Sequence, residues 1–262
     1  MKAKKKFGQN FLIDNIVLDK ISNAVLASEK DLIIEIGPGR GALTHRLVEK
    51  KCNVLAYEID NDLIPVLNTF KKENLKIKNI DFLESDINND ISTYNYDKLF
   101  IVGNLPYYIT TPIIDHILKS DIKHESLTIM VQLEVANRFL SKPKSKDYGY
   151  FTVFLQHFYD VELVTKVKNT SFEPAPKVES AVINLTCKKD VINIEKEYFD
   201  FLKICFKEKR KTLKNNLRDY DFNIIEEILI KHDLTAQARA EECSGEVFID
   251  IYKKLSLNSK IQ

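Results

Sequence analysis

The sequence has few cysteines and no long apolar segment. Its four cysteines, at positions 52, 187, 205 and 243, form no CxxC pair and no ligand spacing with the five histidines. This usage fits a reducing cytosol and gives no reason to expect a metal or a disulfide framework. The longest stretch without a charged side chain, residues 99–114, is interrupted by Asn104, Pro106 and Pro112. It is too short and too broken to span a bilayer, so we expect a soluble protein with no membrane partner.

The start of the chain also lacks the features of a secretory signal. Residues 1–6 are basic, but no apolar segment follows them. A signal peptide needs such an apolar segment behind its basic end. Together with the cysteine usage, this predicts a cytoplasmic location.

The charge is small overall but unevenly distributed. The chain has 39 basic and 38 acidic residues, for a formal net charge of +1. Residues 1–6 hold four lysines and no acid, residues 203–218 hold seven basic residues and one acid, and a smaller basic loop contains Lys142, Lys144 and Lys146. Phosphate contacts depend on local potential, so these segments suit a polyanion-binding surface. Each run alone is also compatible with a solvated helix face.

Strand and helix patterns alternate over the first half of the chain. Helical spacing begins near Ile13, and short apolar runs are separated by further helical segments near residues 42–50, 61–71, 111 and 134. This alternation predicts βαβ units and a parallel sheet covered on both faces, an α/β fold. The strands are expected at 32–36, 53–58, 75–80, 98–103 and 126–132.

The pattern changes after residue 150. Residues 161–167 and 180–185 are typical of two strands joined by a proline-containing loop, which suggests an antiparallel hairpin at the sheet edge. From about residue 190 only helical spacing remains. We therefore expect a catalytic domain over residues 1–188 and a small, all-helical domain over residues 189–262.

A glycine-rich turn follows the first expected buried strand. The chain has only seven glycines, and three of them fall within five residues, at Gly37, Gly39 and Gly41. Between a strand and a helix, glycines let a ligand approach the backbone closely. The arrangement suits a dinucleotide or S-adenosylmethionine, although a tight turn without a ligand would contain the same residues.

Two carboxylates follow the next strands. Glu58 ends the second strand, where it could accept hydrogen bonds from ribose hydroxyls. Asp86 follows the third strand and could accept from an adenine amino group. An ordinary turn or helix cap before Ile87 explains Asp86 equally well.

The segment Asn104-Leu105-Pro106-Tyr107 follows the strand that ends at Gly103. It should therefore lie at the carboxyl edge of the sheet, where α/β folds bind ligands. An adenine amino group is a poor nucleophile because its lone pair is delocalised into the ring. Two acceptors directed at its hydrogens, the Asn104 side-chain oxygen and the Leu105 carbonyl, would return that lone pair to the nitrogen, with Pro106 fixing the turn and Tyr107 stacking on the base. A simple turn between strand and helix is the alternative.

A second loop could close over the base from the other side. Phe172 leads the segment Phe172-Glu-Pro-Ala-Pro-Lys177, in which two prolines favour an extended loop. The aromatic ring of Phe172 is suited to stack on a base opposite Tyr107. The alternative is a rigid edge loop with Phe172 in the core.

Taken together, these segments resemble the KsgA/Erm family of rRNA adenine N6-dimethyltransferases over nearly the whole chain. The match comprises residues 7–12 (FGQNFL), 35–44 (EIGPGRGALT), 104–107 (NLPY) and 172–178 (FEPAPKV), together with Glu58 and Asp86. The resemblance implies a class I methyltransferase fold, a Rossmann-like α/β fold, with no metal. It also implies that Tyr107 and Phe172 sandwich the target adenine and that S-adenosylmethionine is held by Asn10, Leu12, Gly37, Glu58, Asp86 and Asn104.

Within the family, Leu105 and residues 206–217 (FKEKRKTLKNNL) and 239–242 (RAEE) look like the KsgA branch, although Cys243 replaces a usual leucine. That branch implies dimethylation of two adjacent adenosines in the 3′-terminal hairpin loop of small-subunit rRNA, within a ribosomal subunit or its precursor, by a monomeric enzyme. The basic run would contact RNA. The alternatives are an Erm-type large-subunit methyltransferase, a non-enzymatic relative resembling mitochondrial transcription factors of the B type, and a nicotinamide-dependent dehydrogenase that shares only the glycine turn.

Overall fold

The computed structural model of the protein describes residue 4 and residues 7–106, 108–192 and 195–259. The chain forms two compact units. The first contains the chain up to Ala136 together with Val161–Cys187, and the second contains Asn137–Asp160 together with the chain from Lys188. Among the described residues, no helix combines the length and the apolar character needed to cross a membrane.

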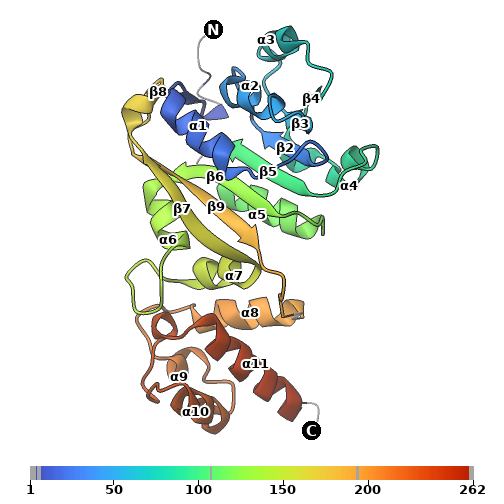
Figure 1. Ribbon diagram of the computed structural model, residues 1–262. Helices are drawn as coiled ribbons and strands as arrows, with labels where there is room; N and C mark the ends of the chain where they lie inside the picture. The colour runs from blue at the N-terminus through green and yellow to red at the C-terminus, as the bar shows by residue number, and fades with distance from the viewer. Residues whose placement is uncertain (1–3, 5–6, 107, 193–194, 260–262) are drawn as a thin grey trace. The chain divides into compact units, whose positions relative to one another are not determined.

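The first unit is built on a seven-stranded sheet with the order β4-β3-β2-β5-β6-β9-β7 (Figure 1). Strands β4 to β6 are parallel, and β9 pairs with β6 in the antiparallel direction. All five residues of β2 are buried, as expected for a central strand covered on both faces. The strands are β2 (Leu32–Ile36), β3 (Asn53–Tyr57), β4 (Leu75–Lys78), β5 (Leu99–Asn104), β6 (Ser126–Gln132), β7 (Tyr159–Val167) and β9 (Ser180–Cys187).

Helices connect successive parallel strands. The first helix begins where Asp14 accepts hydrogen bonds from the backbone N–H groups of Ile16 and Val17, which would otherwise lack partners in the first turn. Its apolar face packs with α2 in a core that also contains β3 residues. The helical segments are α1 (Asn15–Ala24), α2 (Ala42–Val48), α3 (Ile64–Leu67), η2 (Asn68–Phe70), η3 (Phe82–Glu84), α4 (Ile87–Ile91), α5 (Thr110–Lys119) and α6 (Leu133–Phe139).

A two-stranded antiparallel sheet lies beside the main one. It joins β1 (Phe11–Leu12) to β8 (Phe172–Glu173), which follows the short helix η4 (Asn169–Ser171). Leu12 and Phe172 are partners in this pair and belong to one hydrophobic core with residues of α1 and α2. The pairing fixes the segment that precedes α1, because a strand pair holds its backbone through mutual hydrogen bonds.

The second unit is helical. Its core is rich in aromatic residues, and Phe154 of α7 packs edge-on against Phe199 of α8 at 5.1 Å between ring centroids. The structure divides the chain between residues 187 and 188, and it also assigns 137–160 to the helical unit, where α7 packs against α8 and α11. The elements are α7 (Tyr150–Phe158), α8 (Lys196–Cys205), α9 (Leu213–Asn216), α10 (Phe222–Lys231), η5 (Ala240–Glu242) and α11 (Gly245–Ser259).

Candidate active site

The site lies where the strand order of the first unit reverses. Strands β2 and β5 are parallel neighbours, and Ile36 is paired with Gly103. The residues that follow this pair, Gly37 and Asn104, therefore lie side by side at the carboxyl edge of the sheet. Open α/β sheets bind their ligands at this switch point.

A cavity of about 550 Å³ occupies this position. That size is within the range of small-molecule sites in proteins. Five segments supply most of its wall, and they come from β1, the glycine turn, and the ends of β3, β4 and β5. These segments are residues 7–13, 35–43, 57–59, 80–82 and 104–106.

The glycine turn brings backbone to the cavity surface. Gly37 and Gly39 have φ angles of +68° and +60°, which side chains rarely tolerate. A Cβ atom added at Gly37 would meet no atom within 4 Å, so its backbone faces open space. At Gly39 a Cβ would lie 3.2 Å from the Phe11 ring, so a side chain there would crowd β1. The turn thus allows both a close ligand approach and close packing of the N-terminal segment.

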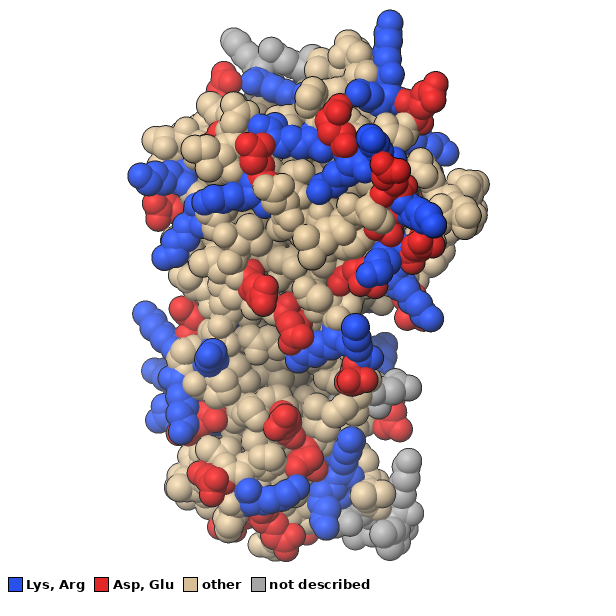
Figure 2. Space-filling view, viewed as in Figure 1, with Lys and Arg blue, Asp and Glu red and all other residues tan. Residues whose placement is uncertain are grey.

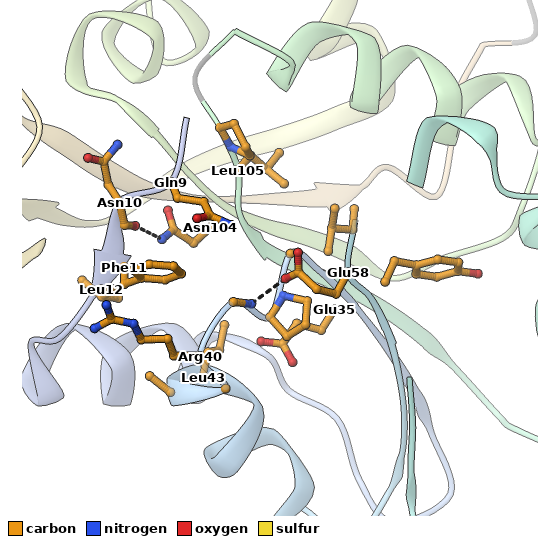
Figure 3. A pocket seen from close by; sticks show the side chains of 18 of the residues that line it. Gln9, Asn10, Phe11, Leu12, Glu35, Arg40, Leu43, Glu58, Asn104 and Leu105 are labelled. Atoms are coloured by element: carbon orange, nitrogen blue, oxygen red, sulfur yellow. Dashed lines mark hydrogen bonds between the residues drawn. The ribbon is translucent and has the colours of Figure 1, made fainter. Parts of the chain in front are cut away.

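Glu58 is held against the glycine turn at the end of β3. One carboxylate oxygen accepts a hydrogen bond from the backbone N–H of Gly39 at 2.9 Å (Figure 3). The other accepts from the backbone N–H of Asp60 at 2.8 Å. The side chain is buried, and this burial raises the pKa of Glu58 above its ordinary value. Each oxygen retains a lone pair that can accept from a ligand hydroxyl.

Glu35, at the end of β2, is a second acid in the wall and was not singled out from the sequence. It is 1% exposed, and its Oε2 has no hydrogen-bond partner among the described residues. Burial raises its pKa to about 8, so the group is mainly protonated at neutral pH. A protonated carboxyl group can donate as well as accept a hydrogen bond.

Asn104 ends β5 with its amide orientation fixed by a backbone contact. Its Nδ2 donates to the carbonyl oxygen of Asn10 at 3.1 Å (Figure 3). A carbonyl can only accept, so the NH₂ group must face Asn10, and Oδ1 is left as the acceptor that Asn104 offers to a ligand. Leu105 and Pro106 follow in the cavity wall. Tyr107, predicted to stack on the base, lies outside the described residues.

Asp86 does not belong to the cavity wall, contrary to its predicted position. Its side chain caps α4 by accepting from the N–H of Asn89 at 3.1 Å. The acid after β4 that lines the cavity is Asp81, which caps η3 by accepting from Leu83 N–H at 3.0 Å. Asp81 is the first acid after β4, and that position was the sequence signal that could have identified it.

Phe172, predicted to stack on the target base, is buried in the core of the first unit. It is 4% exposed, pairs with Leu12 and is not among the residues that line the cavity. Phe172 belongs to one hydrophobic core with residues of α1 and α2, and its stacking on the base stays a prediction. The remaining predicted residues that can be described do line the cavity: Asn10, Leu12, Gly37, Glu58, Asn104, Leu105 and Pro106.

Within the described ranges, no group of three or more His, Cys, Asp and Glu side chains is placed to hold a metal ion. The four cysteines are free thiols. Burial raises the pKa of the Cys52 thiol, which favours its protonated, unreactive form.

The second unit brings two basic segments together. All seven basic residues of 203–218 are exposed, as are Lys142, Lys144 and Lys146. Lys209 donates to the Lys146 carbonyl at 2.7 Å, which joins the two segments. Figure 2 shows basic and acidic side chains interspersed on the face that it displays. The 203–218 run with the 142–146 loop thus forms a local positive surface, defined here as the basic surface.

Comparison with known proteins identifies the chain's family. The sequence model of the family "Ribosomal RNA adenine dimethylase" matches residues 1–257. The chain belongs to this family. The resemblance found from its motifs is thereby confirmed, and a dehydrogenase is excluded as the source of the glycine turn.

Relatives and solved structures agree with the dimethylase assignment. The chain is 42% identical over 261 residues to a protein of Mycoplasmopsis pulmonis named Ribosomal RNA small subunit methyltransferase A, with coverage of 97% of this chain and 100% of the relative. A protein of the same name from Lactobacillus johnsonii is 41% identical, with coverage of 96% and 90%.

Among solved structures, a dimethyladenosine transferase from Plasmodium falciparum aligns with TM-score 0.78 and 25% identity, covering 95% of this chain and 98% of that one. The 23S rRNA methyltransferase ErmE aligns with TM-score 0.76 and 26% identity, covering 94% and 100%. The predicted class I methyltransferase fold of this dimethylase is therefore confirmed.

Proposed function

We propose that this dimethylase transfers methyl groups from S-adenosylmethionine to N6 of two adjacent adenosines in the 3′-terminal hairpin loop of small-subunit rRNA. The product at each base is N6,N6-dimethyladenosine, and the reaction is part of small-subunit maturation. Support comes from the names of the relatives above 40% identity and from the KsgA-like motifs of this chain.

The observation that carries the proposal is the orientation of Asn104. Because its NH₂ group is bound to the Asn10 carbonyl, Oδ1 is available for a hydrogen of the adenine amino group. The Leu105 carbonyl, one residue on, is the second acceptor. Two acceptors on the two hydrogens favour a pyramidal nitrogen with a localised lone pair. A strong general base is not required, because the ammonium product is acidic once formed.

The cavity residues fit S-adenosylmethionine, which when bound supplies an electrophilic methyl group on sulfonium sulfur. Glu58 has the free lone pairs to accept from ribose hydroxyls, and the open backbone at Gly37 admits a close contact. Asp81 takes the role first assigned to Asp86, as the acceptor for an adenine amino group. Asn10 and Leu12 close the cavity from β1.

The RNA substrate is held by the second unit in this proposal. The basic surface contacts phosphates, which positions a structured RNA without reading its sequence. The target adenosine must be unstacked to enter the cavity, as in a loop. The enzyme acts as a monomer in the cytoplasm, on a ribosomal subunit or its precursor.

The choice of ribosomal subunit tests the proposal. Purified protein is incubated with methyl-labelled S-adenosylmethionine and with small or large subunits from a strain that lacks this methylation. We expect label in small-subunit rRNA only. Label confined to large-subunit rRNA, with macrolide resistance on expression, would establish the Erm-type activity and refute the proposal.

A further inference from the structure

Asp60 lies two residues beyond Glu58 and is 3% exposed, yet it is not part of the cavity wall. One carboxylate oxygen accepts from Gln9 Nε2 at 2.9 Å, and the other pairs with Lys4 Nζ at 2.5 Å. Burial would raise the pKa of Asp60, but the hydrogen bonds from Lys4, Gln9 and the Asp62 backbone N–H, with the charge of Lys4, together hold the pKa below its ordinary value. Asp60 is therefore an ionised anchor for residues near the N-terminus.

Gln9 is held from both ends of its amide. Its Oε1 accepts from the Lys4 backbone N–H at 2.8 Å, while its Nε2 donates to Asp60. The next residue, Asn10, provides the carbonyl that binds the Asn104 amide. A continuous series of contacts thus runs from Asp60 through Gln9 and Asn10 to Asn104.

We propose that Asp60 is a positioning residue for methyl transfer, acting through Gln9. By fixing Gln9 it fixes the Asn10 carbonyl, which in turn keeps the Asn104 oxygen directed at the substrate amine. The inference rests on the proposed function, because it assigns Asp60 a part in presenting that acceptor.

The physical reason is the freedom of a terminal amide. The last torsion of an asparagine side chain is broad and roughly two-fold, so its oxygen and NH₂ group exchange places at little cost unless a partner discriminates between them. If the Asn104 NH₂ group faced the cavity, it would present a donor to the amino group of the substrate adenine, which is itself a donor. The Asn10 carbonyl prevents this exchange only while residues 9 and 10 stay in place.

The chain provides a matched control at Asp62. Its carboxylate also pairs with Lys4 Nζ, at 2.6 Å, but its side chain is 59% exposed. Its backbone N–H, not its carboxylate, contacts Asp60. Removal of the Asp62 carboxylate therefore weakens the Lys4 contact and leaves the link between Asp60 and Gln9 intact.

The test compares Asp60→Ala, Gln9→Ala, the double variant and Asp62→Ala by steady-state methylation of undermethylated small subunits. S-adenosylhomocysteine affinity is measured by calorimetry. We expect kcat to fall roughly tenfold in each of the first two variants, the equivalent of one hydrogen bond to a charged group. The affinity should change less than threefold, because Glu58 and the glycine turn remain.

The double variant should be no slower than the slower single variant, since both substitutions break the same hydrogen bond between Asp60 and Gln9. Asp62→Ala should stay within twofold of wild type, and Asp60→Asn, which keeps an acceptor for Gln9, should recover part of the rate.

A wild-type kcat in Gln9→Ala, or losses that multiply in the double variant, would overturn the inference. If Asp60→Ala fails to bind S-adenosylhomocysteine, Gln9→Ala decides alone. Failure of the wild-type protein to methylate small subunits would refute the proposed function, and this inference with it. A methylating wild type with unaffected variants would refute only the role of Asp60.

Discussion

At the scale of single residues, the site is defined by which polar atoms the protein already uses. Asn104 Nδ2 is bound to Asn10, and one lone pair on each Glu58 oxygen is used by a backbone N–H. Asn104 and Glu58 therefore offer acceptors to a ligand, and the hydroxyls and amino groups of a nucleoside are donors. This complementarity is available before any ligand arrives, so little reorganisation is needed on binding.

Replacement of Asn104 by alanine should separate binding from chemistry. Asn104→Ala removes one of the two acceptors for the amine, so the rate of transfer should fall on the order of 100-fold. Cofactor affinity should change only a few-fold. Single-turnover methylation and calorimetry measure the two effects, with the exposed Asn88→Ala as control. Transfer at the wild-type rate by Asn104→Ala would refute the acceptor-pair mechanism.

Asp81 and Asp86 form a natural comparison, because each caps a short helical segment but only Asp81 lines the cavity. Asp81→Ala should weaken S-adenosylhomocysteine binding roughly tenfold, as should Glu58→Ala, through loss of ligand hydrogen bonds. Asp86→Ala should lose only the cap of α4 and should bind S-adenosylhomocysteine like wild type. Calorimetry on the three variants is the measurement, and equal affinities for Asp81→Ala and Asp86→Ala would contradict the reassignment.

Glu35 should make stability depend on pH. Its pKa, raised by burial from 4.5 to about 8, means that between those values the native state holds a proton that the unfolded state has lost. The free energy of unfolding therefore falls as pH rises through this window, by about 1.4 kcal/mol per unit from this group.

Glu35→Gln removes this ionisable group. In urea unfolding at pH 5, 7 and 9, the free energy of unfolding of the variant should therefore rise relative to that of wild type as pH rises. The exposed Glu84→Gln should follow wild type. A constant difference between Glu35→Gln and wild type at all three pH values would show that Glu35 ionises normally.

At the scale of elements, strands buried on both faces were predictable and elements fixed by tertiary contacts were not. The strands β2, β5 and β6 match their predicted ranges to within a residue, because a covered parallel strand is a continuous apolar run. Helix α7 was missed because its aromatic residues favour strands by propensity, and packing in the helical unit overrides that preference.

The pairing of β1 with β8 was equally invisible in the sequence. Each strand has only two residues, which is too short for any periodicity. Yet this pairing places Phe172 in the core and sets Arg40 over the Phe11 ring at 4.3 Å, with an ion pair from Arg40 to Glu173 at 3.1 Å. The positions of Asn10 and Asn104 could be predicted from motif order, but their mutual contact could not.

Substitution of Phe172 tests which role its ring has. As a core residue, Phe172→Ala should lower the free energy of unfolding by about 3–5 kcal/mol, and Phe172→Leu by about 1 kcal/mol. Phe172→Leu should then keep most of its methyl transfer at a temperature where it is folded. Loss of transfer with unchanged stability in Phe172→Leu would instead support stacking on the target base.

At the scale of the whole molecule, we assign cofactor binding to the first unit and RNA binding to the second. The first unit carries the cavity, where Glu58 and Asn104 offer hydrogen-bond acceptors, and the second carries the basic surface. A net charge of +1 conceals this division, since the 39 basic and 38 acidic residues nearly cancel. Affinity for RNA should therefore depend on the second unit and on the salt concentration. Affinity for the cofactor should depend on neither of these.

Charge reversal within the basic surface measures that dependence. Arg210→Glu with Lys211→Glu should weaken small-subunit binding and reduce the slope of log K against log salt by about two, one for each lost phosphate contact. S-adenosylhomocysteine affinity should be unchanged. The matched pair Lys253→Glu with Lys254→Glu, on exposed residues of α11, is the control. Equal losses in both pairs would show that the basic surface has no special role.

The most direct test identifies the modified nucleosides. Undermethylated small subunits are treated with the protein and labelled S-adenosylmethionine, and the rRNA is digested and analysed by mass spectrometry and by position. We expect N6,N6-dimethyladenosine at two adjacent positions of the 3′-terminal hairpin loop, and almost none with Asn104→Ala. Methylation of another nucleoside, or of another atom of adenine, would contradict it.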